Sequence, residues 1–245
     1  MTWHPDMPDE YKNAIVTGDA RELAKRIPDE SIDLMVTDPP YFLPVQTYVG
    51  TREDGWERRT LADTSVLQTY FDVMFEELCP KLKREGSAYI FCDAQSYPIM
   101  YRSLFPHFKY VRLLIWNKVV SYNGYTWRHQ HELIAWCEGY DAGRIPTGDG
   151  DVLDCRGVLQ KDRFHPAEKP VDLLMRLIEK HPTAAIVFDP YAGSASTAVA
   201  TKRVGRNYIA FEIDPDTAEL ARARVLNTQP PLFVMEPEQL ELLDE

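Results

Sequence analysis

An acid, two prolines and a tyrosine stand together at 38–41, directly after a run of apolar residues, in the stretch VTDPPY. Proline lacks an N–H group and has a fixed φ, so neighbouring acceptor groups are held rigidly. A lone Asp-Pro-Pro is typical of a turn, but its position after a buried strand and before an aromatic ring favours a ligand site. We therefore predict a rigid, acidic, aromatic corner that binds a hydrogen-bond donor.

A second acid-bearing turn, DPYAGSAST at 189–197, consists mostly of small residues and precedes a predicted helix. Small side chains let the backbone approach a ligand, and the free N–H groups of a helix start can bind an anion. Glu212 ends the next predicted strand, where dinucleotide folds place an acid on a ribose diol. Since neither G-x-G-x-x-G nor G-x-x-x-x-G-K-[ST] occurs, the pattern favours a nucleoside that carries an amino acid over a nicotinamide cofactor or a triphosphate.

The elements that position these turns alternate between strands and helices. Apolar runs predict strands within 13–20, 32–41, 87–94, 110–116 and 131–137, and helical spacing predicts helices at 20–27, 66–83 and 170–181. Two strand–turn–helix units follow at 184–205 and 207–226. This alternation predicts an α/β fold with a mostly parallel, twisted sheet of seven strands and helices on both faces.

Length and composition predict one domain over 1–245. No apolar run approaches the roughly 20 residues of a membrane span, and the polar N-terminus is unlike a signal peptide, so cytoplasm is the predicted compartment. The four cysteines are widely spaced, and His129, His131 and Cys137 lack the spacing of a metal site. We therefore predict no metal and no membrane partner.

Taken together, DPPY and FDPYAGSAST resemble the motifs of the S-adenosylmethionine-dependent DNA amino methyltransferases. The catalytic motif precedes the cofactor motif, and HPAEKP lies just upstream of the latter, an order similar to the circularly permuted β class. The similarity runs from GDARELAKRIPDESIDLMVTDPPY through LIWNK and HELIAW to ELARARV. One departure is visible, because the turn reads Gly193-Ser194-Ala195 where the family usually has Gly-Ser-Gly. The resemblance implies a Rossmann-like methyltransferase fold with S-adenosyl-L-methionine as cofactor.

The resemblance also implies roles for individual residues. Asp19 would lie near the adenine of the cofactor, Lys169 near its methionine end and Glu212 on its ribose. The implied cofactor-binding residues are Asp19, Asp38, His165, Pro166, Lys169, Asp189, Tyr191, Ala192, Gly193, Ser194, Ser196, Thr197, Glu212 and Ile213.

The same resemblance explains the acidic corner, whose implied catalytic residues are Asp38, Pro39, Pro40 and Tyr41. An adenine amino nitrogen is a poor nucleophile because its lone pair is delocalised into the ring. Asp38 could accept one amino hydrogen and the carbonyl region of the prolines the other. The target base would leave the duplex and stack on Tyr41, and the methyl group would move by direct in-line displacement.

The net charge of −11 argues against bulk attraction to DNA, but the charge is unevenly distributed. Residues 94–131 contain no Asp or Glu and several basic and aromatic residues, whereas 225–245 contain no Lys or Arg and end in an acidic tail. Loops 43–64 and 118–165 are therefore predicted to recognise double-stranded DNA. The predicted DNA-binding residues are Arg52, Arg58, Arg59, Lys118, Tyr122, Tyr125, Trp127 and Arg128.

Several alternatives stay open at this point. Methylation of the cytosine amino group is one, although that group of the family more often has Ser in place of Asp38. An RNA or protein glutamine substrate is another, where related corners often begin with Asn. A non-catalytic DNA- or cofactor-binding module is the third. The recognised sequence, a homodimer and a partner nuclease of a restriction–modification system are also left open.

Overall fold

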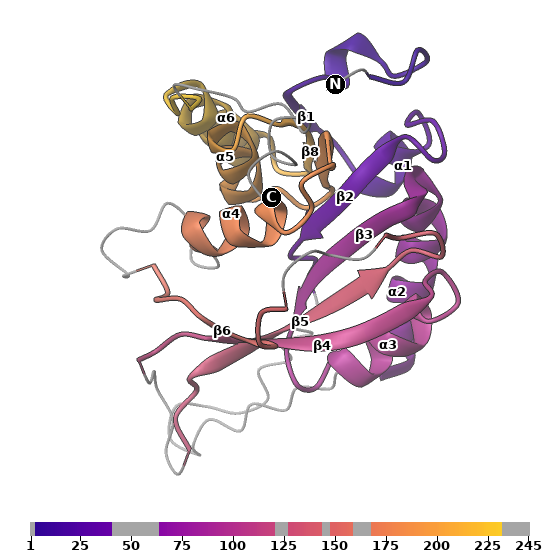
Figure 1. Ribbon diagram of the computed structural model, residues 1–245. Coiled ribbons are helices and arrows are strands. Elements are labelled where there is room, and N and C mark those ends of the chain that lie inside the picture. Colours follow the sequence, from indigo (N-terminus) through magenta and orange to yellow (C-terminus); the bar gives the residue numbers. More distant parts are fainter. Residues whose placement is uncertain (1–2, 41–63, 121–126, 144–147, 159–167, 232–245) are drawn as a thin grey trace, which may run out of the picture.

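A single eight-stranded sheet forms the centre of the molecule (Figure 1). The computed structural model describes residues 3–40, 64–120, 127–143, 148–158 and 168–231. The strands follow the spatial order β1-β8-β7-β2-β3-β5-β4-β6. Their bounds are β1 Ala14–Thr17, β2 Ile32–Thr37, β3 Leu82–Cys92, β4 Tyr110–Asn117, β5 His131–Glu138, β6 Val152–Asp154, β7 Ile186–Asp189 and β8 Asn207–Glu212.

Strand β5 runs antiparallel to both of its neighbours, β3 and β4, and all the other neighbouring strands pair in parallel. The prediction of a mostly parallel sheet is therefore confirmed. Among the described residues the sheet has eight strands where seven were predicted, because β6 adds to the edge beyond β4, with Ile115 opposite Val152. A three-residue strand is too short to produce an alternating apolar pattern, so this part of the predicted loop 118–165 was not recognised as a strand.

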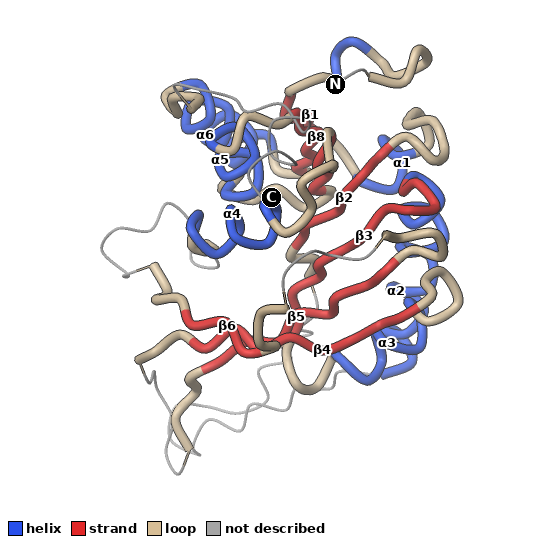
Figure 2. The backbone as a smooth tube through the Cα atoms, in the orientation of Figure 1, coloured by secondary structure: helices blue, strands red, loops and turns tan. Residues whose placement is uncertain are grey.

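Helices cover both faces of the sheet, as predicted (Figure 2). Along β2, Met35 packs in the same cluster as Phe71, whereas its neighbour Leu34 packs with Leu177 on the opposite face. This alternation is the period of two that a strand imposes on its side chains. The helices of the Phe71 face are α1 Ala20–Ala24, α2 Thr64–Leu78 and α3 Tyr97–Leu104, and those of the Leu177 face are α4 Val171–Glu179, α5 Ser196–Arg203 and α6 Pro215–Leu226.

Two helical segments differ from the prediction. The helix predicted at 66–83 ends at Leu78, because a short 3₁₀ turn, Cys79–Lys81, with Pro80 as its second residue follows it, and β3 begins at Leu82. Helix α3 was not predicted, since Pro98 and a mixture of aromatic and polar residues obscure its apolar spacing. The helical spacing predicted for α2 is confirmed, because the apolar residues Leu67, Phe71, Met74, Phe75 and Leu78 along it are all buried.

The sheet order decides where ligands can bind. Parallel strands β1, β8, β7 and β2 are consecutive neighbours, so the turns that follow them meet at one edge of the sheet. Within the described ranges, no helix has both the length and the apolar character to cross a membrane. A search of the same ranges finds no cluster of three or more His, Cys, Asp or Glu side chains suited to a metal ion.

Candidate active site

The two acid-bearing turns meet at the carboxyl edge of β2 and β7. These strands pair in parallel, with Leu34 opposite Val187, so Asp38 and Asp189 lie at adjacent strand ends. Between them lies a cavity of about 110 Å³, which suits a small polar group rather than a whole nucleoside. The described residues that line it are Thr37, Asp38, Phe91, Glu168, Lys169, Leu174, Asp189, Tyr191, Ala192, Gly193, Ser194, Ser196 and Thr197.

Asp189 fastens the small-residue turn to the end of β2. It is buried, and its Oδ1 accepts hydrogen bonds from Thr37 Oγ1 at 2.8 Å and from the Tyr191 backbone N–H at 3.1 Å. Burial raises the pKa of Asp189 to about 6, although the hydrogen bonds from Thr197, Thr37 and Tyr191 act in the opposite direction. The side chain therefore holds the walls of the cavity together.

The small-residue turn leaves room for a ligand. Gly193 has a φ of 49°, and a Cβ added there would meet nothing within 4 Å. Ala195 also takes a left-handed conformation, with φ at 60°, which glycine adopts at no cost and alanine at roughly 1 kcal/mol. The methyl group of Ala195 is buried in a cluster with Val199 and Ala210. The departure from Gly-Ser-Gly therefore adds a methyl group to the core and not to the cavity.

Lys169 links Asp38 to a second carboxylate. Its Nζ donates to Asp38 Oδ2 and lies 3.4 Å from Glu132 Oε2, and Glu132 Oε1 accepts from Lys118 Nζ at 2.6 Å. Burial by itself would lower the pKa of Lys169, but the charges of Asp38 and Glu132 raise it above its usual value. Burial would likewise raise the pKa of Glu132, and the two lysines lower it instead. Lys169 and Glu132 therefore both carry their charges near neutral pH.

A second ion pair braces the segment that carries Lys169. Glu168 is almost fully buried and pairs with Arg224 of α6. Arg224 Nη1 also donates to the Ser194 carbonyl oxygen at 2.9 Å and to Ser196 Oγ at 3.2 Å. One guanidinium group therefore connects helix α6, the small-residue turn and the segment that leads into α4.

Two further predicted acids lie beside the cavity at neighbouring strand ends. Glu212 accepts the backbone N–H of Gly193 at Oε2, at 2.8 Å, and that of Asp214 at Oε1, at 2.9 Å. Each carboxylate oxygen has a second lone pair, which leaves acceptor capacity for hydroxyl groups. Asp19 caps α1 and is held by Arg21, whose hydrogen bonds lower the pKa of its carboxyl group. Glu212 thus keeps acceptor capacity, whereas both carboxylate oxygens of Asp19 accept from Arg21.

The structure brings together the two motifs and Lys169, but other predicted residues lie apart from the cavity or cannot be placed. Pro39 is buried and Pro40 exposed, next to Asp38 in the chain. Ile213 is 68% exposed beyond β8, and Trp127 is 89% exposed. Arg128 is exposed as well, whereas Lys118 is occupied by Glu132. The predicted residues outside the described ranges are Tyr41, Arg52, Arg58, Arg59, Tyr122, Tyr125, His165 and Pro166, as is the acidic tail.

The sequence patterns missed some residues of the site. Glu132, Glu168, Thr37, Phe91 and Arg224 are not among the predicted site residues. The available signal was an acid inside an otherwise apolar strand at Glu132, since such a group needs a buried partner.

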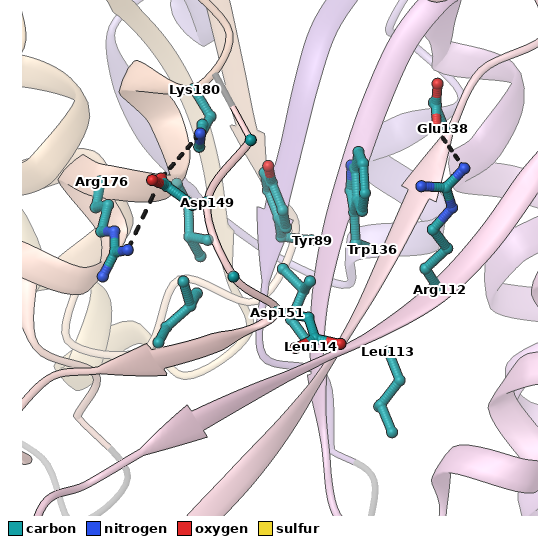
Figure 3. A pocket seen from close by; sticks show the side chains of 14 residues that line it. Tyr89, Arg112, Leu113, Leu114, Trp136, Glu138, Asp149, Asp151, Arg176 and Lys180 are labelled. Carbon is teal, nitrogen blue, oxygen red and sulfur yellow. Dashed lines mark ion pairs between the residues drawn. The ribbon is translucent and has the colours of Figure 1, made fainter. Parts of the chain in front are cut away.

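A larger cavity of about 550 Å³ lies over β3, β4 and β5 on the face of α4 (Figure 3). Tyr89 and Trp136 stand side by side there, and Asp149 forms ion pairs with Lys180 at 2.8 Å and Arg176 at 3.7 Å. By size alone, this cavity would be preferred to the one between the two motifs. None of the predicted site residues that the structure describes lines it, so we assign the chemistry to the smaller cavity between the two motifs.

Fold and site together define a Rossmann-like α/β protein whose carboxyl-edge cavity is lined by an acid, an ammonium group and a small-residue turn. A family model described as DNA methylase, of the N6/N4 amino type, matches residues 32–223. This match spans most of the chain, which therefore belongs to the N6/N4 DNA methylase family.

Two curated relatives agree with this assignment. The type II methyltransferase M.HinfI of Haemophilus influenzae is 26% identical over 96% of this chain and 73% of its own length. The DNA adenine methyltransferase YhdJ of Escherichia coli K12 is 26% identical over 86% of this chain and 82% of its own.

Solved structures share the fold. A complex of M1.HpyAVI with S-adenosylmethionine superposes with a TM-score of 0.65 and 21% identity, over 87% of this chain and 98% of that one. The cytosine-N4-specific PvuII DNA methyltransferase gives a TM-score of 0.68 and 16% identity, over 96% and 95% of the two chains. The Rossmann-like methyltransferase fold is therefore confirmed, whereas circular permutation of the motif order stays a prediction.

Proposed function

We propose that this chain transfers a methyl group from S-adenosylmethionine to the exocyclic amino group of adenine in double-stranded DNA. The observation that carries the proposal is the position of Asp38, whose carboxylate shares one cavity with Lys169 and the turn around Gly193. The residues present fit the cofactor. Open space over Gly193 can receive it, the Lys169 ammonium can bind its carboxylate, and Glu212 can accept hydrogen bonds from its ribose.

The chemistry of Asp38 follows from its position. The bound cofactor supplies an electrophilic methyl group on a sulfonium. Asp38 accepts a hydrogen bond from the amino group of the target base, which makes the nitrogen lone pair more available. Pro39 and Pro40 fix the direction of the chain beyond Asp38, because their φ angles are restricted. The base has to leave the duplex to reach this edge of the sheet.

Adenine is preferred over cytosine on two grounds. The acid at position 38 is the acceptor that the resemblance associates with adenine, and YhdJ, one of the relatives, is named as an adenine methyltransferase. The second candidate is the amino group of cytosine, which the structural similarity to the PvuII enzyme favours. The relative M.HinfI is named as a type II enzyme, so a restriction–modification setting is part of the proposal.

The test is a nucleoside analysis of DNA from cells that express the chain. We expect N6-methyladenine at one short sequence in the wild type, and a loss of about 10²–10³-fold in methyl transfer for Asp38→Ala. Circular dichroism confirms that the variant folds, and Asp216→Asn, which removes an exposed carboxylate of α6, serves as a matched control. N4-methylcytosine would select the second candidate, and full activity of Asp38→Ala would contradict the mechanism.

A further inference from the structure

The contact between Asp38 and Lys169 raises a chemical difficulty for the proposed function. A carboxylate oxygen that accepts from a buried ammonium is a weaker acceptor for an amino group of a base. Lys169 Nζ makes this contact with Asp38 Oδ2 and lies 5.1 Å from the centroid of the Phe91 ring. Oδ2 of the acid that should activate the base is therefore engaged by Lys169.

The same ammonium is the cation best placed for a ligand carboxylate. Among the described residues that line the cavity, Lys169 is the one with a positive charge. Arg224 lies behind the cavity wall and is committed to Glu168, the Ser194 carbonyl oxygen and Ser196. An amino-acid carboxylate that enters the cavity would therefore compete with Asp38 for Lys169.

Glu132 can hold Lys169 during such an exchange. Its Oε2 lies 3.4 Å from Lys169 Nζ, and Lys118 anchors its other oxygen at 2.6 Å. The strand β5 fixes the backbone of Glu132, and β4 ends one residue before Lys118. An ammonium that leaves Asp38 thus keeps one carboxylate partner, which avoids the large cost of an unpaired buried charge.

We propose that Lys169 is shared between Asp38 and the carboxylate of the cofactor, and that Glu132 is the positioning residue that keeps the ammonium between them. Cofactor binding draws Lys169 away from Asp38, and Asp38 then accepts the amino hydrogen of the base. The acid is available only when the methyl donor is present, so cofactor binds productively before DNA. This inference rests on the proposed function and adds an order of binding to it.

Titration calorimetry with S-adenosylhomocysteine, which carries the carboxylate, tests the exchange. We expect Asp38→Asn to bind it about tenfold more tightly than the wild type, because the amide competes poorly for Lys169. Binding of 5′-methylthioadenosine, which lacks the amino-acid part, should not change. The gain should disappear when Asp38→Asn is combined with Lys169→Met, a pair that keeps the net charge of the site. Equal affinity of Asp38→Asn and the wild type, or a gain that survives without Lys169, would overturn the inference.

A crystal structure of the wild type with S-adenosylhomocysteine gives a readout that needs no variant. Lys169 Nζ should contact the ligand carboxylate and Glu132, and its contact with Asp38 should be lost. An intact contact between Lys169 and Asp38 beside bound ligand would refute the exchange while leaving methyl transfer to DNA unaffected. If the wild type does not bind S-adenosylhomocysteine at all, the proposed function fails together with the inference.

Discussion

At the scale of single residues, Asp189 is the clearest case of a group whose environment differs between the folded and unfolded chain. Its folded pKa of about 6 lies above the ordinary value of 3.8 because of burial. A raised pKa means that the folded state binds the proton more tightly. The contribution to stability is therefore complete below pH 3.8 and is lost as the pH rises through 6. One pKa unit corresponds to about 1.4 kcal/mol, so the difference between the folded and the ordinary pKa of Asp189 corresponds to a free energy of about 3 kcal/mol.

Asp189→Asn should remove this dependence, since an amide oxygen still accepts from Thr37 and Tyr191 but does not titrate. We expect the unfolding free energy of the wild type, relative to the variant, to fall by about 3 kcal/mol between pH 3.5 and about 7. Urea unfolding at a series of pH values measures this difference. Asp216→Asn, at an exposed position, should show no such trend, and a flat difference for Asp189→Asn would refute the linkage.

The sequence predicted the residues of the site better than their partners. Asp38 and the turn around Gly193 could be predicted because motif and strand position agree, whereas Lys169 was implied by the family resemblance. The structure brings all three to one cavity. The pairing of Glu132 with Lys169 and that of Arg224 with Glu168 could not be predicted, because Glu132 comes from β5 and Arg224 from α6, far away in the chain. Pairing across a sheet depends on strand order, which local patterns do not encode.

At the scale of elements, the close contact of β3 with the end of β5 depends on a glycine. Gly139 directly follows β5, and its N–H donates to the Gly86 carbonyl oxygen of β3 at 2.9 Å. A Cβ at Gly139 would lie 2.4 Å from the Arg84 carbonyl oxygen and 2.5 Å from that of Gly86. Backbone atoms of a central strand cannot move aside as a flexible side chain can.

Gly139→Ala should therefore lower the unfolding free energy by about 1–3 kcal/mol or more, as overpacking does. Chemical denaturation measures the change, and far-UV circular dichroism reports whether the variant still folds. The matched control is Gly143→Ala, where an added Cβ meets nothing within 4 Å and stability should stay the same. Equal stability of both variants would show that the β3–β5 junction adapts.

Elements with strong periodicity were predicted well. The apolar spacing of α2 and the runs in β2, β3 and β5 gave the right element type, because burial on a fixed face imposes a period. The edge strand β6 and the helix α3 were missed. Each of these depends on tertiary contacts: β6 pairs with the edge of β4, and α3 packs against α2 and β5.

At the scale of the whole molecule, an acidic chain has to bind DNA against its own net charge of −11. Phosphate contacts must therefore be concentrated at a few basic groups near the carboxyl edge of the sheet. Lys118 and Lys169, both near this edge, are paired with Glu132 and Asp38. Arg128 is exposed, three residues before β5. We therefore predict that Arg128 contacts a DNA phosphate next to Trp127.

Arg128→Ala should reduce the slope of log K against log salt concentration by about one and leave the methylated sequence unchanged, as expected when a single phosphate contact is lost. Trp127→Ala, which removes a ring that is 89% exposed, should weaken binding by about 1–3 kcal/mol without a change in slope, because stacking releases no counterion. Fluorescence anisotropy with a labelled duplex at several salt concentrations measures both effects.

Arg84→Ala is the control, since Arg84 is exposed and paired with Asp141 at the opposite end of β3. If Arg84→Ala and Arg128→Ala change the slope equally, DNA is bound by general charge alone, and the recognition surface lies elsewhere.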